Sequence, residues 1–410
     1  MQRFFVLGTH PQLSLAELYA CFANTDFSLA SEEVCVLDGA INTSGNLGGI
    51  IKSGDIVAEV PISDSDGLID FIANLIVQKN PTGKINFGIS HYSLDGRHSK
   101  DKSFFKLGVT VKKALKEHGI SSRLVTSKEK NLSAVIVKTN KLLTSGVEIC
   151  LVESRGKYLI GITDWVQPFE EYSRRDYGRP ARDMKRGMLP PKLARMMVNL
   201  SNHQSKILLD PFCGSGTILM EAALLGGFDL IIGSDKDEKA IADTKTNLDW
   251  LAREFGVDIS NIRLIQSRAE KIHEALSARP EQWPKAFGRV DSVVTEPYLG
   301  PPLSGRESSN QIKRTIEELK KLYIDSFQSL ARIIKKDGRV VVALPLIRYD
   351  GEMMPVRIIP DLIKLGFELI DPLPASMPQK MKQYSLQGGI VYGREDQRVW
   401  REILVMYTRS

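Results

Sequence analysis

Residues 206–217 read Lys-Ile-Leu-Leu-Asp-Pro-Phe-Cys-Gly-Ser-Gly-Thr, which combines an apolar strand, an acid at its end and a glycine-containing turn. The apolar segment 218–225 follows and predicts a helix. In a doubly wound sheet such a turn lies at the carboxyl ends of the strands, where ligands bind, and glycine lets the backbone approach a ligand closely. The candidate ligand-binding residues are Asp210, Phe212, Gly214, Gly216 and Thr217.

The glycine turn differs from two common nucleotide-binding motifs. Its spacing is not G-x-G-x-x-G, and its acid precedes the glycines, which argues against a dinucleotide-binding fingerprint. The turn also lacks the Gly-Lys-Ser/Thr sequence of a phosphate-binding loop. A tight turn without a ligand remains the alternative for this segment taken alone.

Strands and helices alternate after residue 190, which favours a parallel sheet with crossover helices. We predict strands at 207–210, 230–234, 262–266, 291–295, 340–344, 367–370 and 403–407. In such a sheet the ends of neighbouring parallel strands meet at one edge, so the residues that follow each strand are candidates for one site.

Polar residues follow the second and third of these strands. Asp235 is placed to accept hydrogen bonds from two vicinal ribose hydroxyls, with Lys236 beside it, although an acid there also suits a helix cap. Arg268, Ala269 and Glu270 are natural neighbours for an adenine ring, although Glu270 equally suits the first turn of a helix. Together with the glycine turn, these positions indicate a nucleoside cofactor.

The fourth strand ends in Thr295-Glu296-Pro297-Tyr298. An acid followed directly by proline leaves a carboxylate and a carbonyl oxygen as neighbouring acceptors, and the proline removes a competing N–H. Two acceptors can hold the hydrogens of an exocyclic amine and orient its nitrogen toward a methyl donor. The alternative is a capping acid and a Pro-Tyr turn. We take these four residues as candidate catalytic residues for amine methylation, a reaction that needs no metal.

A basic region lies between residues 97 and 141, where twelve Lys and Arg residues accompany three acids. Because the whole chain has a net charge of only +6, this region holds the entire excess. A helix is predicted over 104–118, with lysines off its apolar stripe, and strands are predicted at 133–138 and 146–152. The candidate phosphate-binding residues are Lys106, Lys112, Lys113, Lys116 and Arg123. The alternative is a solvated charged surface.

Residues 166–187 bring aromatic, proline and charged residues together and are predicted to form a linker. The linker separates two small α+β units, 1–60 and 61–165, from a C-terminal domain at 188–410. These boundaries divide a chain that is longer than a single hydrophobic core usually grows.

The linker carries a basic cluster whose role has two interpretations. Arg174 and Arg175 begin the cluster, which continues to Arg186 and includes Lys185. It either binds phosphate, as we predict for Arg174 and Arg175, or pairs with the nearby aspartates Asp176 and Asp183 to lock two domains together.

The composition argues against several classes of protein. Of the 410 residues, 42% are hydrophobic and 25% charged, and no segment offers the long apolar stretch that a membrane span requires. The four cysteines are scattered without clustered histidines, so we expect neither a disulfide framework nor a metal site. A cytoplasmic protein fits these observations best.

These motifs, in this order, resemble the THUMP-domain RNA methyltransferases, and within them most closely the tRNA guanosine N2-methyltransferases that act at guanosine 10. The matching segments are 4–8, 13–18, 132–135, 167–169, 179–180, 182–194 and 210–221. The resemblance implies a Rossmann-like class I methyltransferase domain with a mostly parallel seven-stranded sheet. It also implies small α+β domains before it, a ferredoxin-like unit over 1–60 and a THUMP RNA-binding domain over 61–165.

The same resemblance implies functional roles. S-adenosylmethionine would bind over Asp210, Gly214, Gly216 and Asp235, with the Leu189–Leu193 segment, which includes Pro190, closing one side. The basic N-terminal half would hold tRNA by its backbone, so shape and reach would set the site. Glu296 and the Pro297 carbonyl would position the N2 amine of a guanosine.

The sequence departs from the family at the catalytic strand end, where members usually have Asp-Pro-Pro-Tyr-Gly. A gap-free match sets Glu296 on the acid and Pro297 on the first proline, and Leu299 then stands where the tyrosine is expected. A second register sets Thr295 on the acid and Tyr298 on the tyrosine. We prefer the first register because it preserves the glycine that follows and the phase of the strand.

Other functions remain open at this stage. Methylation of ribosomal RNA or of adenine N6 uses a similar amine acceptor. An RNA-binding protein with a lapsed catalytic site is the non-enzymatic alternative, favoured by the changed catalytic strand end. The resemblance also raises a small activating protein partner, which the sequence leaves open.

Overall fold

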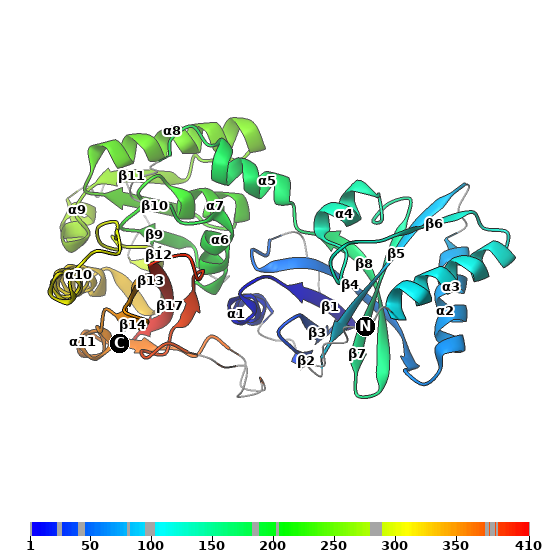
Figure 1. Cartoon of the computed structure of the whole chain (residues 1–410). Helices are drawn as coiled ribbons and strands as arrows, with labels where there is room; N and C mark the ends of the chain where they lie inside the picture. The colour runs from blue at the N-terminus through cyan, green and yellow to red at the C-terminus, as the bar shows by residue number, and fades with distance from the viewer. Residues whose placement is uncertain are drawn as a thin grey trace.

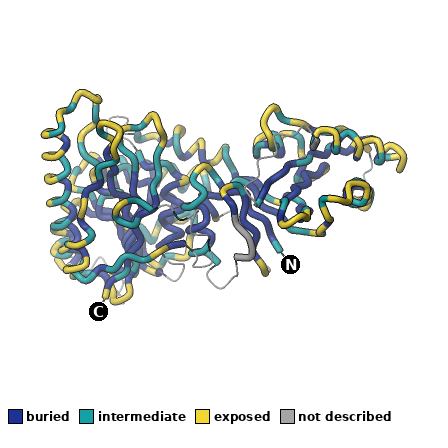
Figure 2. The backbone as a smooth tube through the Cα atoms, turned by 60° about the horizontal axis from the view of Figure 1, so that its bottom comes forward, coloured by how far each residue is buried: buried dark blue, intermediate teal, exposed yellow. Residues whose placement is uncertain are grey.

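The computed structural model describes residues 2–22, 27–39, 46–79, 83–94, 103–182, 188–201, 205–278, 289–373, 377, 382 and 384–409. An N-terminal unit built on one sheet lies beside a C-terminal α/β domain (Figure 1). The buried backbone runs through the centre of both parts, and most of the exposed backbone lies on the outer helices and turns (Figure 2).

One eight-stranded sheet runs through the N-terminal unit in the order β2-β3-β1-β4-β8-β7-β5-β6. Its strands are β1 (Gln2–Leu7), β2 (Phe27–Ala30), β3 (Val34–Asp38), β4 (Ile50–Pro61), β5 (Ile85–Ser93), β6 (Ser122–Val125), β7 (Val147–Ser154) and β8 (Lys157–Val166). Strand β4 pairs with β1 on one side and β8 on the other. The predicted units 1–60 and 61–165 therefore share one sheet.

Two helices, α2 (Ser65–Gln78) and α3 (Ser103–Glu117), pack on this sheet through apolar side chains. Ile72 of α2 and Val111 and Leu115 of α3 are fully buried in that core. The lysines of α3 lie off this buried face, as predicted. The helix predicted over 104–118 is therefore confirmed to within a residue at each end.

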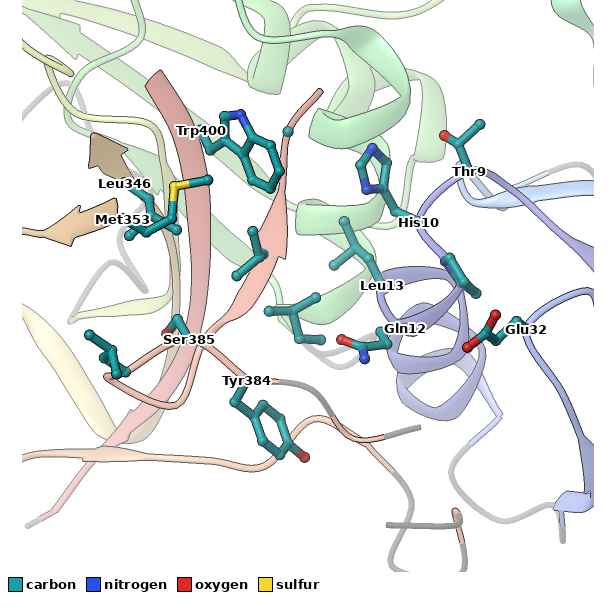
Figure 3. Close-up of a pocket in the computed structure, with 15 residues that line it drawn as sticks. Thr9, His10, Gln12, Leu13, Glu32, Leu346, Met353, Tyr384, Ser385 and Trp400 are labelled. Atoms are coloured by element: carbon teal, nitrogen blue, oxygen red, sulfur yellow. The ribbon is translucent and has the colours of Figure 1, made fainter. Parts of the chain in front are cut away.

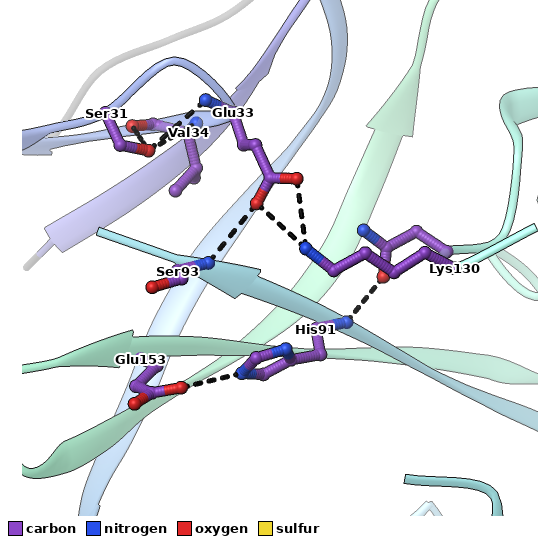
Figure 4. A network of polar contacts seen from close by, with 8 residues as sticks. Ser31, Glu33, Val34, His91, Ser93, Lys130 and Glu153 are labelled. Carbon is purple, nitrogen blue, oxygen red and sulfur yellow. Dashed lines mark hydrogen bonds and ion pairs between the residues drawn. The ribbon is translucent and has the colours of Figure 1, made fainter. Parts of the chain in front are cut away.

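Polar contacts also join the two predicted N-terminal units (Figure 4). Lys130 Nζ donates to Glu33 Oε1 at 3.0 Å, and the Ser93 backbone N–H donates to Glu33 Oε2 at 3.4 Å. The Nε2 atom of His91, at the end of β5, lies 3.2 Å from Glu153 Oε2 on β7. Glu33 of the first unit is thereby tied to the second, in addition to the shared sheet.

The strand predicted at 133–138 is wrong, because this segment forms helix α4 (Ala134–Thr139). Ser133 caps the helix, since its side chain accepts a hydrogen bond from the Ile136 N–H at 3.3 Å. Ala134 and Val137, three residues apart, are buried, whereas Val135 is 49% exposed. Buried side chains that recur at helical spacing, together with the Ser133 cap, stabilise a helix here and outweigh the preference of β-branched residues for strands.

The C-terminal sheet has the order β11-β10-β9-β12-β13-β17-β15, with short β14 paired to β13 and β16 paired to β17. Its strands are β9 (Ile207–Asp210), β10 (Leu230–Asp235), β11 (Ile262–Gln266), β12 (Val290–Thr295), β13 (Ile334–Tyr349), β14 (Glu352–Pro355), β15 (Phe367–Leu369), β16 (Ile390–Tyr392) and β17 (Val399–Thr408). The first five strands of the order are parallel, and β17 and β15 run antiparallel to their neighbours. The predicted mostly parallel seven-stranded sheet is confirmed.

Helices cover both faces of this sheet (Figure 1). They are α6 (Pro191–Leu200), α7 (Thr217–Leu225), α8 (Glu238–Phe255), α9 (Ile272–Ser277), α10 (Ser309–Ala331) and α11 (Ile359–Lys364), with a short η2 (Ala269–Lys271) before α9. Side chains of α6, α7 and α8 share one core with α1 (Pro11–Cys21) of the N-terminal unit. Those of α9, α10 and α11 form the core on the other face.

The predicted linker contains helix α5 (Phe169–Ser173) and a π-helical turn, η1 (Arg174–Gly178). Arg175 Nε donates to Glu221 Oε1 on α7 at 2.6 Å, and Arg195 Nε on α6 donates to Glu221 Oε2 at 2.9 Å. Because Arg175 is only 2% exposed, its predicted contact with RNA is wrong. Arg174, which is exposed and pairs with Glu254, keeps its RNA-binding prediction.

The linker therefore helps to lock the two parts of the chain together, through the pair of Arg175 with Glu221 of the C-terminal domain. A second buried acid, Glu17 of α1, accepts hydrogen bonds from the Gly48 and Gly49 N–H groups and from Asn199 Nδ2 of α6. Burial raises the pKa of Glu17 to about 7, while these hydrogen bonds oppose the rise. Residues 183–187, which include Asp183, Lys185 and Arg186, lie outside the described residues.

The Glu221→Ala substitution is expected to destabilise the protein by about 3–5 kcal/mol, because it leaves two buried guanidinium groups without their shared carboxylate. The free energy of unfolding, measured by denaturant titration, checks this. The control is Glu59→Ala, which breaks an exposed pair with Lys157 and should cost at most about 1 kcal/mol. Equal losses in the two variants would contradict a special role for Glu221.

Candidate active site

A cavity of about 380 Å³ lies at the carboxyl ends of β9, β10 and β12. Residues from all the predicted motifs line it, namely Asp210, Phe212, Gly214, Thr217, Asp235, Lys236, Arg268, Ala269, Glu270, Glu296, Pro297 and Tyr298. Asp235 and Glu296, predicted to serve the cofactor and the substrate, therefore face one cavity. Its volume is in the usual range of sites for small molecules.

The glycine turn has a left-handed backbone at both of its glycines. Gly214 has φ of +53° and Gly216 has φ of +85°, which side chains with a Cβ rarely adopt. Gly216 is the N-cap of α7, and a Cβ there would lie 2.9 Å from the Thr244 side chain. Gly216 does not line the cavity, and neither does Pro190, the N-cap of α6. These two predicted cofactor contacts act instead as supports of the turn and of α6.

Asp235 holds the turn from the next strand. Its Oδ2 accepts a hydrogen bond from the Gly214 N–H at 3.1 Å, and its Oδ1 accepts one from the Asp237 N–H at 3.0 Å. Each carboxylate oxygen has a further lone pair for a ligand hydroxyl. Asp237, not Asp235, caps α8 by accepting from the Lys239 N–H. The alternative role predicted for Asp235 as a helix cap is therefore wrong.

Asp210 is buried at the end of β9, only 1% exposed. Its Oδ1 accepts hydrogen bonds from Thr295 Oγ1 at 2.7 Å and from the Phe212 N–H at 3.1 Å. Burial raises the pKa of Asp210 to about 7, and the two hydrogen bonds limit the rise. A cationic ligand in the cavity would favour the ionised form of this carboxyl.

Thr295 supports Asp210 and does not contact the cavity. It is 2% exposed, and its hydroxyl is committed to the Asp210 carboxylate. Its predicted direct part in catalysis is therefore wrong. Glu296, which lines the cavity, is the acid that a substrate can reach, and this favours the register that sets Glu296 on the acid of the motif.

Glu296 is paired with an arginine that the sequence did not reveal. Arg401 Nε on β17 donates to Glu296 Oε1 at 2.5 Å, and Arg401 Nη2 lies 3.4 Å from Oε2. Burial lowers the pKa of Arg401, but the neighbouring Glu296 carboxylate raises it above the ordinary value, so the guanidinium is charged. The two residues are 105 positions apart, and only the pairing of β17 with β13 brings them together.

Tyr298 presents an aromatic ring at the mouth of the site. The residue is 49% exposed and lines the cavity. Its backbone is fixed from behind, because the buried Tyr323 Oη on α10 donates to the Tyr298 carbonyl at 2.6 Å. A ring held in this way can stack on a planar base.

Leu189, from the segment predicted to close one side of the cofactor site, also lines the cavity. Further lining residues were not predicted as site residues, namely Met188, Pro211, Cys213, Ser215, Ile218, Leu299 and Leu322. Arg179 of the linker also supports the site, since its Nη1 donates to Thr217 Oγ1 at 2.6 Å. Burial lowers the pKa of this guanidinium to about 10. The Arg-Pro sequence at 179–180 had marked the linker in the sequence but gave no hint of this contact.

The predicted phosphate-binding lysines gather on the N-terminal unit. Lys112, Lys113 and Lys116 of α3 line one surface hollow together with residues 119–122. Lys106 and Arg123 are also exposed on this unit. The charges are thus accessible and close together, as a surface for a polyanion requires.

A second cavity, of about 600 Å³, lies where the N-terminal unit meets the C-terminal domain (Figure 3). His10 and Gln12 at the start of α1 line it opposite Trp400 of β17. The His10 ring packs on Tyr392 of β16 with 4.0 Å between ring centroids. This cavity includes none of the predicted site residues, but it shows that α1 contacts the strands next to Arg401.

Comparison with known proteins adds to this geometry. A model of the RMKL-like methyltransferase domain matches residues 179–348, and a DNA methylase model matches residues 104–246. A probable tRNA (guanine(10)-N2)-dimethyltransferase of Methanothermococcus thermolithotrophicus is 32% identical over 165 residues, which cover 40% of this chain and 86% of the relative. The chain belongs to the RMKL-like methyltransferase family. The predicted resemblance to RNA methyltransferases is confirmed at this level.

Other relatives in this family match a shorter share of their length. The tRNA (guanine(10)-N2)-dimethyltransferase of Methanothermobacter thermautotrophicus is 31% identical over 160 residues, which cover 39% of each chain. The chain thus matches less than half of this relative. The crystal structure of TrmN from Thermus thermophilus aligns over 100% of both chains with a TM-score of 0.53 and 19% identity, which shows a shared fold.

The family assignment and the sheet topology together confirm a methyltransferase domain of the predicted Rossmann-like class, the class that uses S-adenosylmethionine as methyl donor. The residues of the cavity fit this cofactor, since a carboxylate for ribose hydroxyls, a glycine turn and a buried acid share one space. Within the described ranges, no three His, Cys, Asp or Glu residues form a metal cluster. In the same part of the chain, no helix has the length and apolarity to cross a membrane.

The Asp235→Ala substitution is expected to weaken binding of S-adenosylmethionine by at least about tenfold, because it removes both acceptors for the ribose and the support of the glycine turn. Isothermal titration calorimetry measures this loss. Asp237→Ala is the matched control, since Asp237 caps α8 and does not line the cavity, and it should leave the affinity within about twofold. Similar affinities of wild type and Asp235→Ala would contradict the assignment.

Proposed function

We propose that this protein transfers a methyl group from S-adenosylmethionine to the exocyclic N2 amine of a guanosine in tRNA, at guanosine 10. The observation that carries the proposal is the single cavity shared by Asp235 and by Glu296, Pro297 and Tyr298. A donor bound at the first residue and a base held by the other three would lie within one site. The relatives named as tRNA (guanine(10)-N2)-dimethyltransferases support this choice of substrate.

The residues of the cavity have distinct parts in this reaction. S-adenosylmethionine supplies a methyl group on a sulfonium. The Glu296 carboxylate and the Pro297 carbonyl accept the two amine hydrogens and turn the nitrogen toward the methyl carbon. As the N–C bond forms, the C–S bond breaks with its electrons going to sulfur, and the amine proton passes to the Glu296 carboxylate or to water. Tyr298 stacks on the base.

The N-terminal unit holds the RNA in this proposal. Residues 61–165 act as a THUMP-type RNA-binding unit, and the lysines of α3 contact phosphates without reading bases. Glu221 pairs with Arg175 of the linker and with Arg195 of α6, which fixes this unit relative to the catalytic cavity, so the reach between them selects the nucleotide. We place the enzyme in the cytoplasm, where it meets tRNA. A small activating protein partner remains a prediction from the family resemblance.

Deletion of the gene is expected to remove N2-methylguanosine from the tRNA pool, and the wild-type protein is expected to restore it. Glu296→Ala should lower methyl transfer by at least about 100-fold, because the amine loses its charged acceptor. Mass spectrometry of nucleosides from digested tRNA measures both effects.

The exposed Glu317→Ala on α10 is the control for that experiment and should restore the nucleoside fully. If the deletion strain loses N6-methyladenosine and keeps N2-methylguanosine, the methylated base is adenine and not guanine. Adenine is the second candidate because a DNA methylase model also matches the chain. An unchanged nucleoside profile in the deletion strain would refute the activity.

Replacing Lys112, Lys113 and Lys116 together by alanine is expected to weaken tRNA binding and to lower the slope of log Kd against log salt, by about 0.9 for each phosphate that is no longer neutralised. Filter binding at several salt concentrations measures both. Cofactor affinity should not change. The exposed Lys313 and Lys321 of α10 provide a control pair. An equal salt slope for the wild type, the α3 variant and the α10 control would contradict the RNA contact and indicate that the α3 lysines form a solvated surface.

A further inference from the structure

We propose that Arg401 is a positioning residue that fixes the carboxylate of Glu296 for the substrate amine. The proposal rests on the proposed function and extends it to a residue on β17. Its basis is the contact of Arg401 Nε with Glu296 Oε1 at 2.5 Å. The side chains of Arg401 and Glu296 are only 10% and 15% exposed, so water screens this pair little.

The need for such a residue follows from the length of the acid. A glutamate has one more rotatable bond than the aspartate usual at this position, so its carboxylate samples more orientations. An amine must find its acceptor in one orientation, because its nitrogen has to face the methyl carbon. A charged guanidinium that holds one oxygen removes the added freedom.

The contact is asymmetric, and this leaves an acceptor for the substrate. Arg401 holds Oε1 closely, whereas its Nη2 lies 3.4 Å from Oε2. A carboxylate oxygen accepts two hydrogen bonds, so Oε2 keeps room for an N–H of the base. The arrangement therefore orients Glu296 without consuming its second oxygen.

The position of Arg401 is itself set by the fold. Arg401 lies opposite Pro345 of β13 and opposite Tyr392 of β16. The preceding residue, Trp400, lines the cavity between the two parts of the chain (Figure 3), as the alternation of side chains along a strand allows. Strand β17 thus connects the junction with the N-terminal unit to the catalytic acid.

Steady-state kinetics of Arg401→Met, with tRNA and labelled S-adenosylmethionine, tests this role. We expect kcat to fall by about 10- to 100-fold while KM for both substrates stays within about twofold. Arg401→Lys should recover part of kcat, because lysine keeps the charge but loses the fork of donors. In a Glu296→Gln background, Arg401→Met should change kcat by less than about twofold, since it acts through Glu296.

The exposed Arg348→Met on β13 is the matched control and should leave kcat unchanged, because the Arg348 side chain donates to the Glu395 carbonyl, away from the catalytic cavity. The inference is overturned if Arg401→Met keeps wild-type kcat, if its loss multiplies with that of Glu296→Gln, or if cofactor affinity falls with it. A wild-type protein that methylates no tRNA would refute the proposed function. An active wild type with an equally active Arg401→Met variant would refute only the role of Arg401.

Discussion

The hydrogen bond from Thr295 Oγ1 to Asp210 Oδ1 joins the two halves of the site. It connects the ends of β9 and β12, which are neighbours in the sheet, at a position that is closed to water. The residues on one side of this bond form the glycine turn, and the residue after Thr295 is Glu296, the proposed catalytic acid. The spacing between a bound cofactor and a bound base depends on this buried contact.

The site also depends on how the N-terminal unit is attached. Glu221 lies on the helix that follows the glycine turn and holds one arginine from the linker and one from α6. Glu17 ties α1 to the same helix α6. Buried charges of this kind cost desolvation energy, so we interpret them as fixing the geometry between domains and not as a large gain in stability. A substrate as large as tRNA requires such a fixed geometry if reach selects the nucleotide.

Local motifs were predictable from the sequence, and contacts between distant strands were not. The glycine turn, Asp235 and Glu296 each follow an apolar run, so their place at the sheet edge could be inferred. Arg401 and Glu296 meet only because β17 inserts beside β13, which no spacing in the sequence announces. The strand predicted at 133–138 failed because a β-branched run was given more weight than the cap that Ser133 provides.

The central claim is that one sheet edge presents a methyl donor to a guanine amine held by Glu296. A crystal structure of the protein with S-adenosylhomocysteine and guanosine monophosphate tests it most directly. We predict the ribose hydroxyls on Asp235, the N2 amine within hydrogen-bond distance of Glu296, and Arg401 still on the other carboxylate oxygen. Binding of the two ligands in separate cavities, or a guanine whose amine faces away from Glu296, would contradict it.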